Sequence, residues 1–290
     1  MAVHFPSSLT SLENIEMLSD KSRFAKVIRQ IGLPHPRTIL LETERDLEAL
    51  SDELFEGAFL KPARSQEFFE HFKVKAFRTH SRIEALSRLR EIQKAGFAAM
   101  LQEYIPGPAT HHYFIDGFVD RFGRVCARFA RQRLRMYPPD FGNSTYMISV
   151  ALREISEAVA TVDRLLSSIR FRGIFSTELK YDRRDGLFKI LEVNARPWWF
   201  IEFATTSGVN VCRLAYEDAL GMQVQPIEDY DVGSRCLHPY YDLHSFLHLY
   251  RGHQLTIGSW LKSWWGAKQP EFCWDDPLPA IWDFFSRIHP

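Results

Sequence analysis

The sequence predicts a fold that mixes antiparallel strand pairs with amphipathic helices, and three observations carry that prediction. In residues 173–197, two runs that alternate apolar and polar residues flank a turn-rich segment, which is typical of a β-hairpin. Residues 113–120 and 123–135 form a second pair of the same kind. Apolar residues recur at the spacing of helices that bury one face in residues 20–31, 81–95 and 151–169.

The composition is that of an ordinary globular protein and excludes several classes. At 290 residues, the chain can bury a sizeable core and form one or two domains. Hydrophobic residues make up 46% and charged residues 25% of it, which excludes a disordered chain. Lys plus Arg and Asp plus Glu balance at 36 each, so no overall charge favours nucleic acid or an anionic membrane as a partner. Any site for an anion must therefore be local.

Cysteine usage and the lack of long apolar runs lead us to expect a cytoplasmic protein. The four cysteines show no C-x-x-C spacing, which fits a reducing compartment and argues against a disulfide framework or a zinc knuckle. Residues 1–19 lack the continuous apolar core of a signal peptide. No apolar run reaches the ~18 residues that a transmembrane helix requires.

The first hundred residues predict short strands between helices. The helix at 20–31 is expected to end at Gly32, because glycine adopts the left-handed conformation that ends helices and two prolines follow it. A polar, helix-favouring segment follows at 43–54. The predicted strands are 39–41, 58–62 and 97–105, and residues 63–69 are predicted to form a loop.

The second half continues this alternation. Residues 136–147 contain two prolines and a glycine, which predicts a loop close to the substrate. A further helix is predicted within 204–221. In the aromatic-rich tail, His244 and His248 have the spacing of two zinc ligands on a helix. No third ligand is evident in the sequence, so we expect no metal there.

The hairpin at 173–197 brings two carboxylates together. If its turn is centred on Asp185, Glu178 lies opposite Glu192 and Ser176 lies opposite Asn194, with Ile190 expected on the same face as Glu192. Carboxylates about 5 Å apart across a sheet repel each other unless a cation lies between them. A hard cation such as Mg²⁺ would suit these oxygen ligands. Two solvated glutamates that bind no metal are the alternative.

The strand 123–135 carries three arginines on one face, Arg131, Arg133 and Arg135. Like charges in a row repel unless they face water or an anion, so these residues are candidates for binding phosphates or an acidic substrate. A solvated edge strand that discourages pairing with other chains is an equal alternative.

The segments Thr177-Glu178-Leu179 and 191–197, which read T-E-L and L-E-V-N-A-R-P, resemble the metal-binding end of the ATP-grasp superfamily. The resemblance implies that Glu178, Glu192 and Asn194 hold the Mg²⁺ ions bound to ATP, with Mn²⁺ as a possible substitute. It also implies that Arg196 orients a carboxylate or stabilises an oxyanion.

Further motifs follow in the order expected for that family. Asp20-Lys21, the G-L-P-x-P turn at 32–36 and the strand F-L-K-P at 59–62 imply that Lys21 and Lys61 contact ATP phosphates. The run M-L-Q-E-Y-I-P-G at 100–107 resembles the linker that holds adenine.

One segment departs from the family pattern. The residues after Lys61 contain no glycine, although many family members cradle phosphates there with the backbone amides of a glycine-rich loop. Either Arg64 and Ser65 replace those amides or nucleotide binding is altered. The nucleotide-binding residues implied in all are Lys21, Lys61, Arg64, Ser65, Gln102, Glu103, Tyr104, Ile105 and His111.

The resemblance implies an α+β architecture, the ATP-grasp fold, with two lobes that grip ATP between antiparallel sheets. We expect a lead segment at 1–19, a small lobe and adenine linker at 20–105, a metal and substrate lobe at 106–225, and an aromatic-rich extension at 226–290. Most of the family has another domain in front, which we expect to be missing here or supplied by another polypeptide.

The function implied is that of an ATP-dependent carboxylate–amine ligase, which forms an acyl phosphate and then an amide, with ADP and phosphate released. Arg196, Arg131 and Arg133 would be its catalytic residues. The expected partners are small acids and amines, with no nucleic acid or membrane, and a homo-oligomer or partner subunit is possible. A kinase on the same scaffold and a non-catalytic nucleotide-binding subunit are the alternatives.

Overall fold

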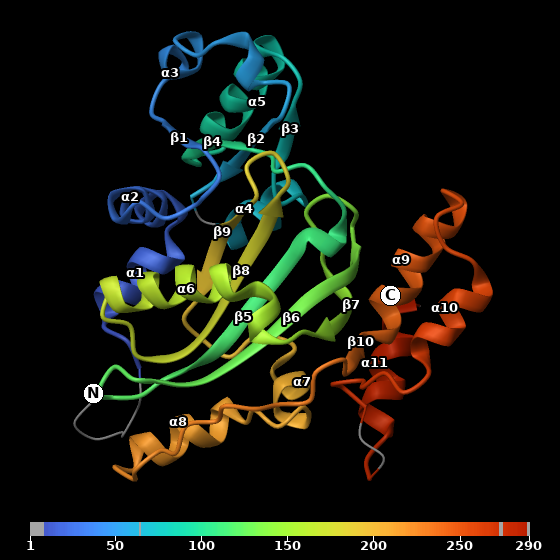
Figure 1. Cartoon of the computed structure of the whole chain (residues 1–290). Helices are drawn as coiled ribbons and strands as arrows, with labels where there is room; N and C mark the ends of the chain where they lie inside the picture. Colours follow the sequence, from blue (N-terminus) through green and yellow to red (C-terminus); the bar gives the residue numbers. More distant parts are fainter. Residues whose placement is uncertain (1–8, 64, 273–274, 289–290) are drawn as a thin grey trace.

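The computed structural model describes residues 9–63, 65–272 and 275–288. It shows a small upper lobe, a larger lower lobe and a group of C-terminal helices to one side (Figure 1). The chain begins with α1 (Leu12–Ser19) and α2 (Lys21–Ile31), which pack on the large lobe. The Asp20 carboxylate caps α2, and Gly32 ends it with a φ of 72°, so the helix predicted at 20–31 is confirmed.

The small lobe is a four-stranded antiparallel sheet in the order β1-β4-β2-β3. Leu47, Leu60, Phe68 and Leu89 fill its core. The lobe consists of β1 (Thr38–Leu41), α3 (Glu44–Glu48), a short 3₁₀ turn (Asp52–Leu54), β2 (Ala58–Pro62), α4 (Ser65–Phe72), β3 (Phe77–Thr79), α5 (Arg82–Lys94) and β4 (Ala99–Glu103).

The segment after Lys61 is a helix, where the sequence predicts a loop. From Ser65 onward the chain forms α4, so the prediction for 63–69 is wrong over most of its length. The reason is aromatic packing: Phe68 is fully buried and lies with its ring centroid 4.6 Å from that of Phe72 and 5.7 Å from that of Phe77.

The large lobe is a six-stranded antiparallel sheet in the order β10-β7-β6-β5-β8-β9. One face packs against α6 and α2, and the other packs against α7 and α8 (Figure 1). The strands and helices are β5 (His112–Val119), β6 (Val125–Tyr137), β7 (Asn143–Ser149), α6 (Ser156–Ser168), β8 (Gly173–Asp182), β9 (Leu187–Asn194), α7 (Ile201–Thr206), α8 (Val211–Ala219) and β10 (Arg235–Leu237), with 3₁₀ turns at Ala109–His111 and Leu152–Ile155.

Two expectations about β6 and its surroundings are corrected. The strand pairs with β5 on one side and β7 on the other, so it is not a solvated edge strand. It also extends to Tyr137, and β7 begins at Asn143. The loop predicted at 136–147 is therefore confined to residues 138–142.

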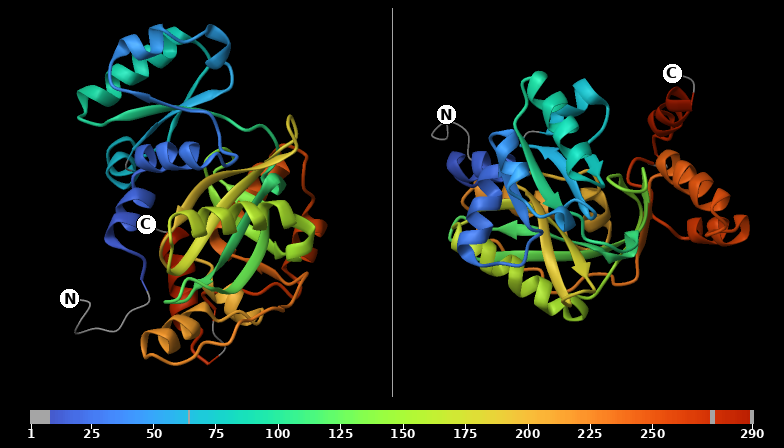
Figure 2. Two further views of the ribbon diagram at one scale, coloured as in Figure 1. Left: turned by 60° about the vertical axis from the view of Figure 1, so that its left-hand side comes forward. Right: turned by 90° about the horizontal axis from the view of Figure 1, so that it is seen from above.

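The tail forms α9 (Pro239–Arg251), α10 (Ile257–Trp264) and α11 (Leu278–Ile288), which lie beside the large lobe and project from it (Figure 2). A buried ion pair joins them to the sheet: Arg135 donates from Nε and Nη2 to the two oxygens of Asp242, at 2.8 and 2.7 Å. The Trp260 indole donates to the same carboxylate at 2.9 Å. Across the described residues, no helix combines the length and the apolar character needed to cross a membrane.

Candidate functional site

The β8–β9 hairpin has the predicted register at its open end. Glu178 pairs with Glu192, and Ser176 pairs with Asn194. A bulge then shifts the register, so that Leu179 pairs with Ile190. Because a bulge inserts one residue and reverses the alternation beyond it, Ile190 turns into the core and is 1% exposed. The expectation that Ile190 shares a face with Glu192 is therefore wrong.

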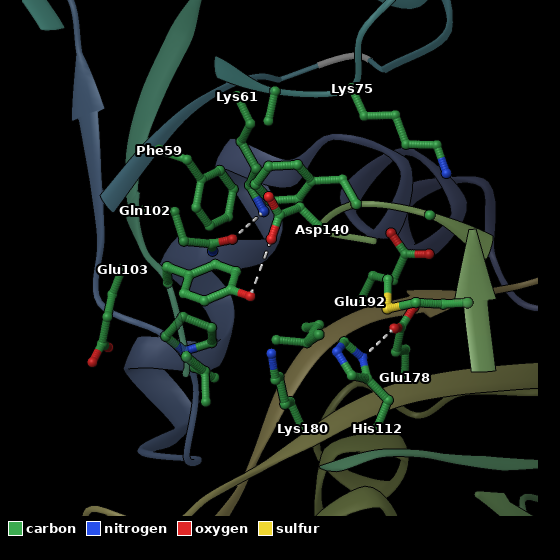
Figure 3. A pocket seen from close by; sticks show the side chains of 18 of the residues that line it. Phe59, Lys61, Lys75, Gln102, Glu103, His112, Asp140, Glu178, Lys180 and Glu192 are labelled. Carbon is green, nitrogen blue, oxygen red and sulfur yellow. Dashed lines mark hydrogen bonds and ion pairs between the residues drawn. The ribbon is translucent and has the colours of Figure 1, made fainter. Parts of the chain in front are cut away.

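A cavity of about 210 Å³ lies between the two lobes, and the carboxylate pair lines it (Figure 3). Residues 140–142 of the β6–β7 connection and Asn143 at the start of β7 also line it. The sequence-predicted residues that this cavity brings together are Lys21, Lys61, Gln102, Glu103, Tyr104, Ile105, Arg133, Glu178 and Glu192.

The remaining predicted residues have other positions. Arg64 lies outside the described residues, and Ser65 is the first residue of α4. Asn194 lies next to the cavity, where its amide donates to Glu192 Oε1 at 3.2 Å. Arg196 is exposed just beyond β9 and donates to the Pro197 carbonyl at 3.1 Å.

At the carboxylate end, cationic and polar groups surround the two glutamates. Glu178 Oε1 accepts a hydrogen bond from Arg133 Nη2 at 3.0 Å and lies 2.8 Å from His112 Nδ1. Lys21 Nζ lies 3.8 Å from Glu192 Oε2. Burial alone would raise the pKa of Glu178, but Arg133 and His112 outweigh it and hold that pKa well below its usual range. Glu178 is thus an anion at neutral pH.

The histidine that lines the cavity is His112, whereas the resemblance implies His111. His111 is buried under the turn at Gly107 and packs against Tyr181. A 3₁₀ turn ends at His111, and β5 begins with the next residue. Because this boundary sets the phase of the strand, His112 points to the cavity. Burial and then Arg133 lower the pKa of His112 to about 4, so its imidazole is neutral at pH 7.

Three lysines line the cavity in addition to Lys21, and two of them, Lys61 and Lys180, are buried. Lys61 Nζ donates to Gln102 Oε1 at 2.7 Å. Burial, followed by repulsion from Lys21, lowers the pKa of Lys61 to about 7. Lys180 and Lys75 also line the cavity, and burial is the main cause that lowers the pKa of Lys180 to about 8 and also lowers that of Lys75. An anion bound here would favour the charged form of each lysine.

The other end of the cavity is aromatic and apolar. Phe59, Tyr104 and Phe141 line it together with Ile105. The Arg78 guanidinium lies over the Tyr104 ring, 3.5 Å from its centroid, and fixes the ring in place. The arrangement provides a slot for a flat ring at one end and groups for a polyanion and a metal ion at the other.

Comparisons with known proteins agree with this geometry. No protein-family model matches the chain. A D-aspartate ligase from Enterococcus faecium (strain Aus0004) is 31% identical over 213 residues, which are 70% of this chain and 50% of that protein. The chain therefore spans about half the length of this curated relative.

Solved structures share the fold. An L-amino acid ligase from Bacillus licheniformis matches with a TM-score of 0.53 at 21% identity, over 73% of this chain and 49% of that one. A biotin carboxylase from Campylobacter jejuni matches with a TM-score of 0.63 at 19% identity, over 78% and 51%. The chain is an ATP-grasp protein. The α+β, two-lobed ATP-grasp fold expected from the sequence is confirmed.

The three arginines of β6, Arg131, Arg133 and Arg135, differ in their surroundings: one lines the cavity and two bind internal carboxylates. Arg131 is 3% exposed and donates from Nε to Asp116 Oδ2 at 2.6 Å. Arg135 binds Asp242, as described above. All three arginines were expected to be candidates for binding phosphates or an acidic substrate, but Arg131 and Arg135 are paired with internal carboxylates, as a buried guanidinium requires. Arg133 lines the cavity.

Several residues that line the cavity were not predicted from the sequence. Lys180 could have been found, because it shares a strand face with Glu178. His112 opposes Lys180 directly across the β5–β8 pair. Lys75 lies between α4 and β3, and Phe141 lies between β6 and β7. In such connections no periodicity indicates the direction of a side chain.

Proposed function

We propose that this chain is the catalytic part of an ATP-dependent carboxylate–amine ligase. The observation that carries the proposal is the pair Glu178 and Glu192, opposed across a hairpin at the end of a cavity that also holds Lys21 and Lys61. The names of two similar proteins, a D-aspartate ligase and an L-amino acid ligase, support an amino acid as one of the substrates.

The residues at the carboxylate end fit a magnesium site. Glu178, Glu192 and Asn194 offer the carboxylate and amide oxygens that Mg²⁺ prefers. Glu192 suits this role because its side chain is 40% exposed and its contact with Lys21 is long, at 3.8 Å. Bound there with ATP, the metal would neutralise negative charge on the phosphates. Mn²⁺ would bind the same oxygens.

The chain's own groups would hold the remainder of the nucleotide. Phe59 and Tyr104 would enclose the adenine ring, and Lys21 and Lys61 would bind phosphate oxygens as compact point charges. Arg133, already directed at Glu178, would orient an anionic acid beside the γ-phosphate. Arg196 would act at the acyl group only if the segment after β9 turns toward the cavity in the ligand-bound state.

The reaction would proceed in two balanced steps. A carboxylate oxygen of the acid attacks the γ-phosphorus, the bond to the β-phosphate oxygen breaks, and ADP leaves with an acyl phosphate formed. The amine nitrogen then attacks the acyl carbon, inorganic phosphate leaves with the bonding electrons, and the amine loses a proton. Closure of the two lobes would keep water away from the acyl phosphate.

Trapping the acyl phosphate tests the proposal. The protein is incubated with ATP, Mg²⁺, excess hydroxylamine and a panel of amino and hydroxy acids that includes D-aspartate and the L-amino acids. A ligase yields ADP and a hydroxamate in equal amounts. AMP with pyrophosphate would contradict the proposal, and a stable phosphorylated product without hydroxamate would identify a kinase.

A binding experiment tests whether this chain binds ATP and whether binding depends on magnesium. ATP and MgCl₂ together should raise the melting temperature above the value with ATP alone, because a ligand of the folded state stabilises it by mass action. The matched variant Glu192→Gln keeps the side chain's shape and should lose only the magnesium-dependent part of the shift. Equal shifts with and without magnesium would overturn the metal assignment.

A further inference from the structure

A second group of side chains that can bind a metal lies among the C-terminal helices, outside the interlobe cavity. His238 precedes α9, Glu271 lies in the segment after α10, and Asp283 lies in α11. One ligand atom from each lies within 4.8 Å of the others. Within the described ranges, this is the one group of three or more His, Cys, Asp or Glu side chains that meets this spacing.

The fold holds the first of these side chains rigidly. His238 is 1% exposed, and its backbone N–H donates to the Thr145 carbonyl at 2.9 Å. Its ring packs against Trp199 and Tyr241, with centroid distances of 4.7 Å to each. A buried imidazole fixed in this way is oriented before any ligand arrives, which lowers the entropy lost on binding.

The carboxylate of Glu271 is oriented from the opposite side. Its Oε2 lies 2.9 Å from His238 Nε2, and its Oε1 accepts a hydrogen bond from the Trp199 indole at 2.9 Å. An outer hydrogen bond to the second oxygen of a ligating carboxylate is the usual support of a metal ligand. Trp199 is therefore a positioning residue. By holding Oε1 of Glu271, it leaves Oε2 directed at the imidazole of His238.

All three side chains line one cavity of about 210 Å³, whose other walls include Trp264, Phe272 and Ile281. The described residues that line this cavity and those that line the interlobe cavity have no member in common. The space admits an ion together with water, and the apolar walls strengthen electrostatic contacts inside it.

We propose that His238, Glu271 and Asp283 bind a divalent transition-metal ion, with Zn²⁺ as the best fit. One imidazole nitrogen and two carboxylate oxygens leave a fourth tetrahedral position for water. The imidazole disfavours Mg²⁺, which prefers a shell of oxygens. The ion would tie α11 to the start of α9 and, through Trp199, to the segment that follows the β8–β9 hairpin.

The histidine pair singled out by its spacing serves as the control. His244 stacks on Tyr137 at a centroid distance of 5.3 Å and packs edge-on against Tyr240 at 4.7 Å. His244 and His248 are absent from the described group of candidate ligands. The double variant His244→Gln/His248→Gln removes two imidazoles from the same helix and should leave metal binding intact.

The test measures metal content and thermal stability of the full chain. After treatment with EDTA and dialysis, the protein is titrated with ZnCl₂ and, separately, with MgCl₂. We expect one zinc per chain and a rise in melting temperature of about 5 °C at a hundredfold excess over Kd. MgCl₂ at the same concentrations should give no such rise.

Variants then assign the ligands. Asp283→Asn and Glu271→Gln keep side-chain shape and should each abolish the zinc-dependent shift, whereas Glu192→Gln at the interlobe cavity should retain it. Trp199→Phe should weaken zinc by about 10-fold to 100-fold without changing the stoichiometry, because it removes only the outer hydrogen bond. Less than half a zinc per chain, or full zinc binding by both Asp283→Asn and Glu271→Gln, would overturn the proposal.

Discussion

The two lobes contribute different chemistry to the cavity between them. The small lobe supplies Lys61 and the aromatic rings of Phe59 and Tyr104, whereas the large lobe supplies the carboxylates of Glu178 and Glu192. The large lobe also contributes the cations Arg133 and Lys180. A ligand with a flat ring, a polyanionic middle and a divalent cation would satisfy both sides. The contrast therefore supports the proposed binding of Mg-ATP more strongly than either lobe does alone.

The largest effect on activity is expected from replacing one of the two carboxylates of the large lobe. Glu178→Gln removes the charge that would hold magnesium and leaves Arg133 without its anionic partner. ATP-dependent product formation should fall by about 100-fold to 1000-fold, the range seen when a group that stabilises a charged transition state is removed.

ADP release under saturating ATP measures this effect. Glu103→Gln is the matched control, because Glu103 also lines the cavity but its side chain pairs with Arg184. The adenine contact implied for this residue would come from its backbone, so the variant should retain most of the activity. Comparable losses in both variants would show that the cavity tolerates no loss of negative charge and would remove the special role of Glu178.

The lysines of the cavity predict that ATP affinity depends on pH. Without ligand, the pKa of Lys61 is about 7, so this lysine loses its proton as the pH rises above 7. Phosphate favours the charged form, so ATP binding above pH 7 must take up a proton. ATP affinity should therefore fall as the pH rises, by up to about tenfold per pH unit, when measured by calorimetry between pH 6 and 9.

Two variants identify the lysine responsible. Lys61→Arg keeps its charge over this range and should flatten the dependence between pH 7 and 8. Lys180→Arg should flatten it only above about pH 8, where the pKa of Lys180 lies. An unchanged slope in Lys61→Arg would place Lys61 away from the phosphates.

A smaller effect is expected at the aromatic end. Tyr104→Ala removes a ring from the proposed adenine slot, and stacking between a base and an aromatic side chain contributes about 1–3 kcal/mol. The dissociation constants of ATP and AMP should both rise by about tenfold, because both share the adenine ring. Tyr104→Phe keeps the ring and should bind as the wild type does, and a selective loss of ATP would place Tyr104 near the phosphates.

The smallest effect on nucleotide binding is expected at Arg131. Arg131→Met leaves Asp116 buried without its partner and should lower the free energy of unfolding by about 3–5 kcal/mol. The ATP dissociation constant of the folded protein should change less than twofold. The double variant Arg131→Met/Asp116→Leu should recover most of the stability, whereas a large loss of ATP affinity in either variant would restore Arg131 to the site.

Local patterns in the sequence predicted what depends on neighbouring residues. Alternation and a central turn placed Glu178 opposite Glu192, because both signals lie within one hairpin. The phase of β5 was not predictable in the same way, since the turn that ends at His111 decides which histidine faces the cavity. The bulge that turns Ile190 into the core was also not visible in the alternation of apolar and polar residues.

Contacts between segments that are far apart in the sequence could not be predicted from local patterns. The partner of Arg135 is Asp242, which is 107 residues away, and nothing near either residue points to the other. The helix α4 formed where a loop was expected because four phenylalanines from three segments pack together there. Burial of this kind overrides local preference.

The ion pair between Arg135 and Asp242 also limits how the protein can be shortened. Removal of the chain from α9 onward would take away both Asp242 and the helices that cover Arg135, which is 7% exposed in the intact chain. The guanidinium would then face water without its carboxylate, on the strand that also carries Arg133 two residues away. A shortened protein should therefore carry an uncharged residue at position 135, so that any loss of activity can be separated from the loss of this ion pair.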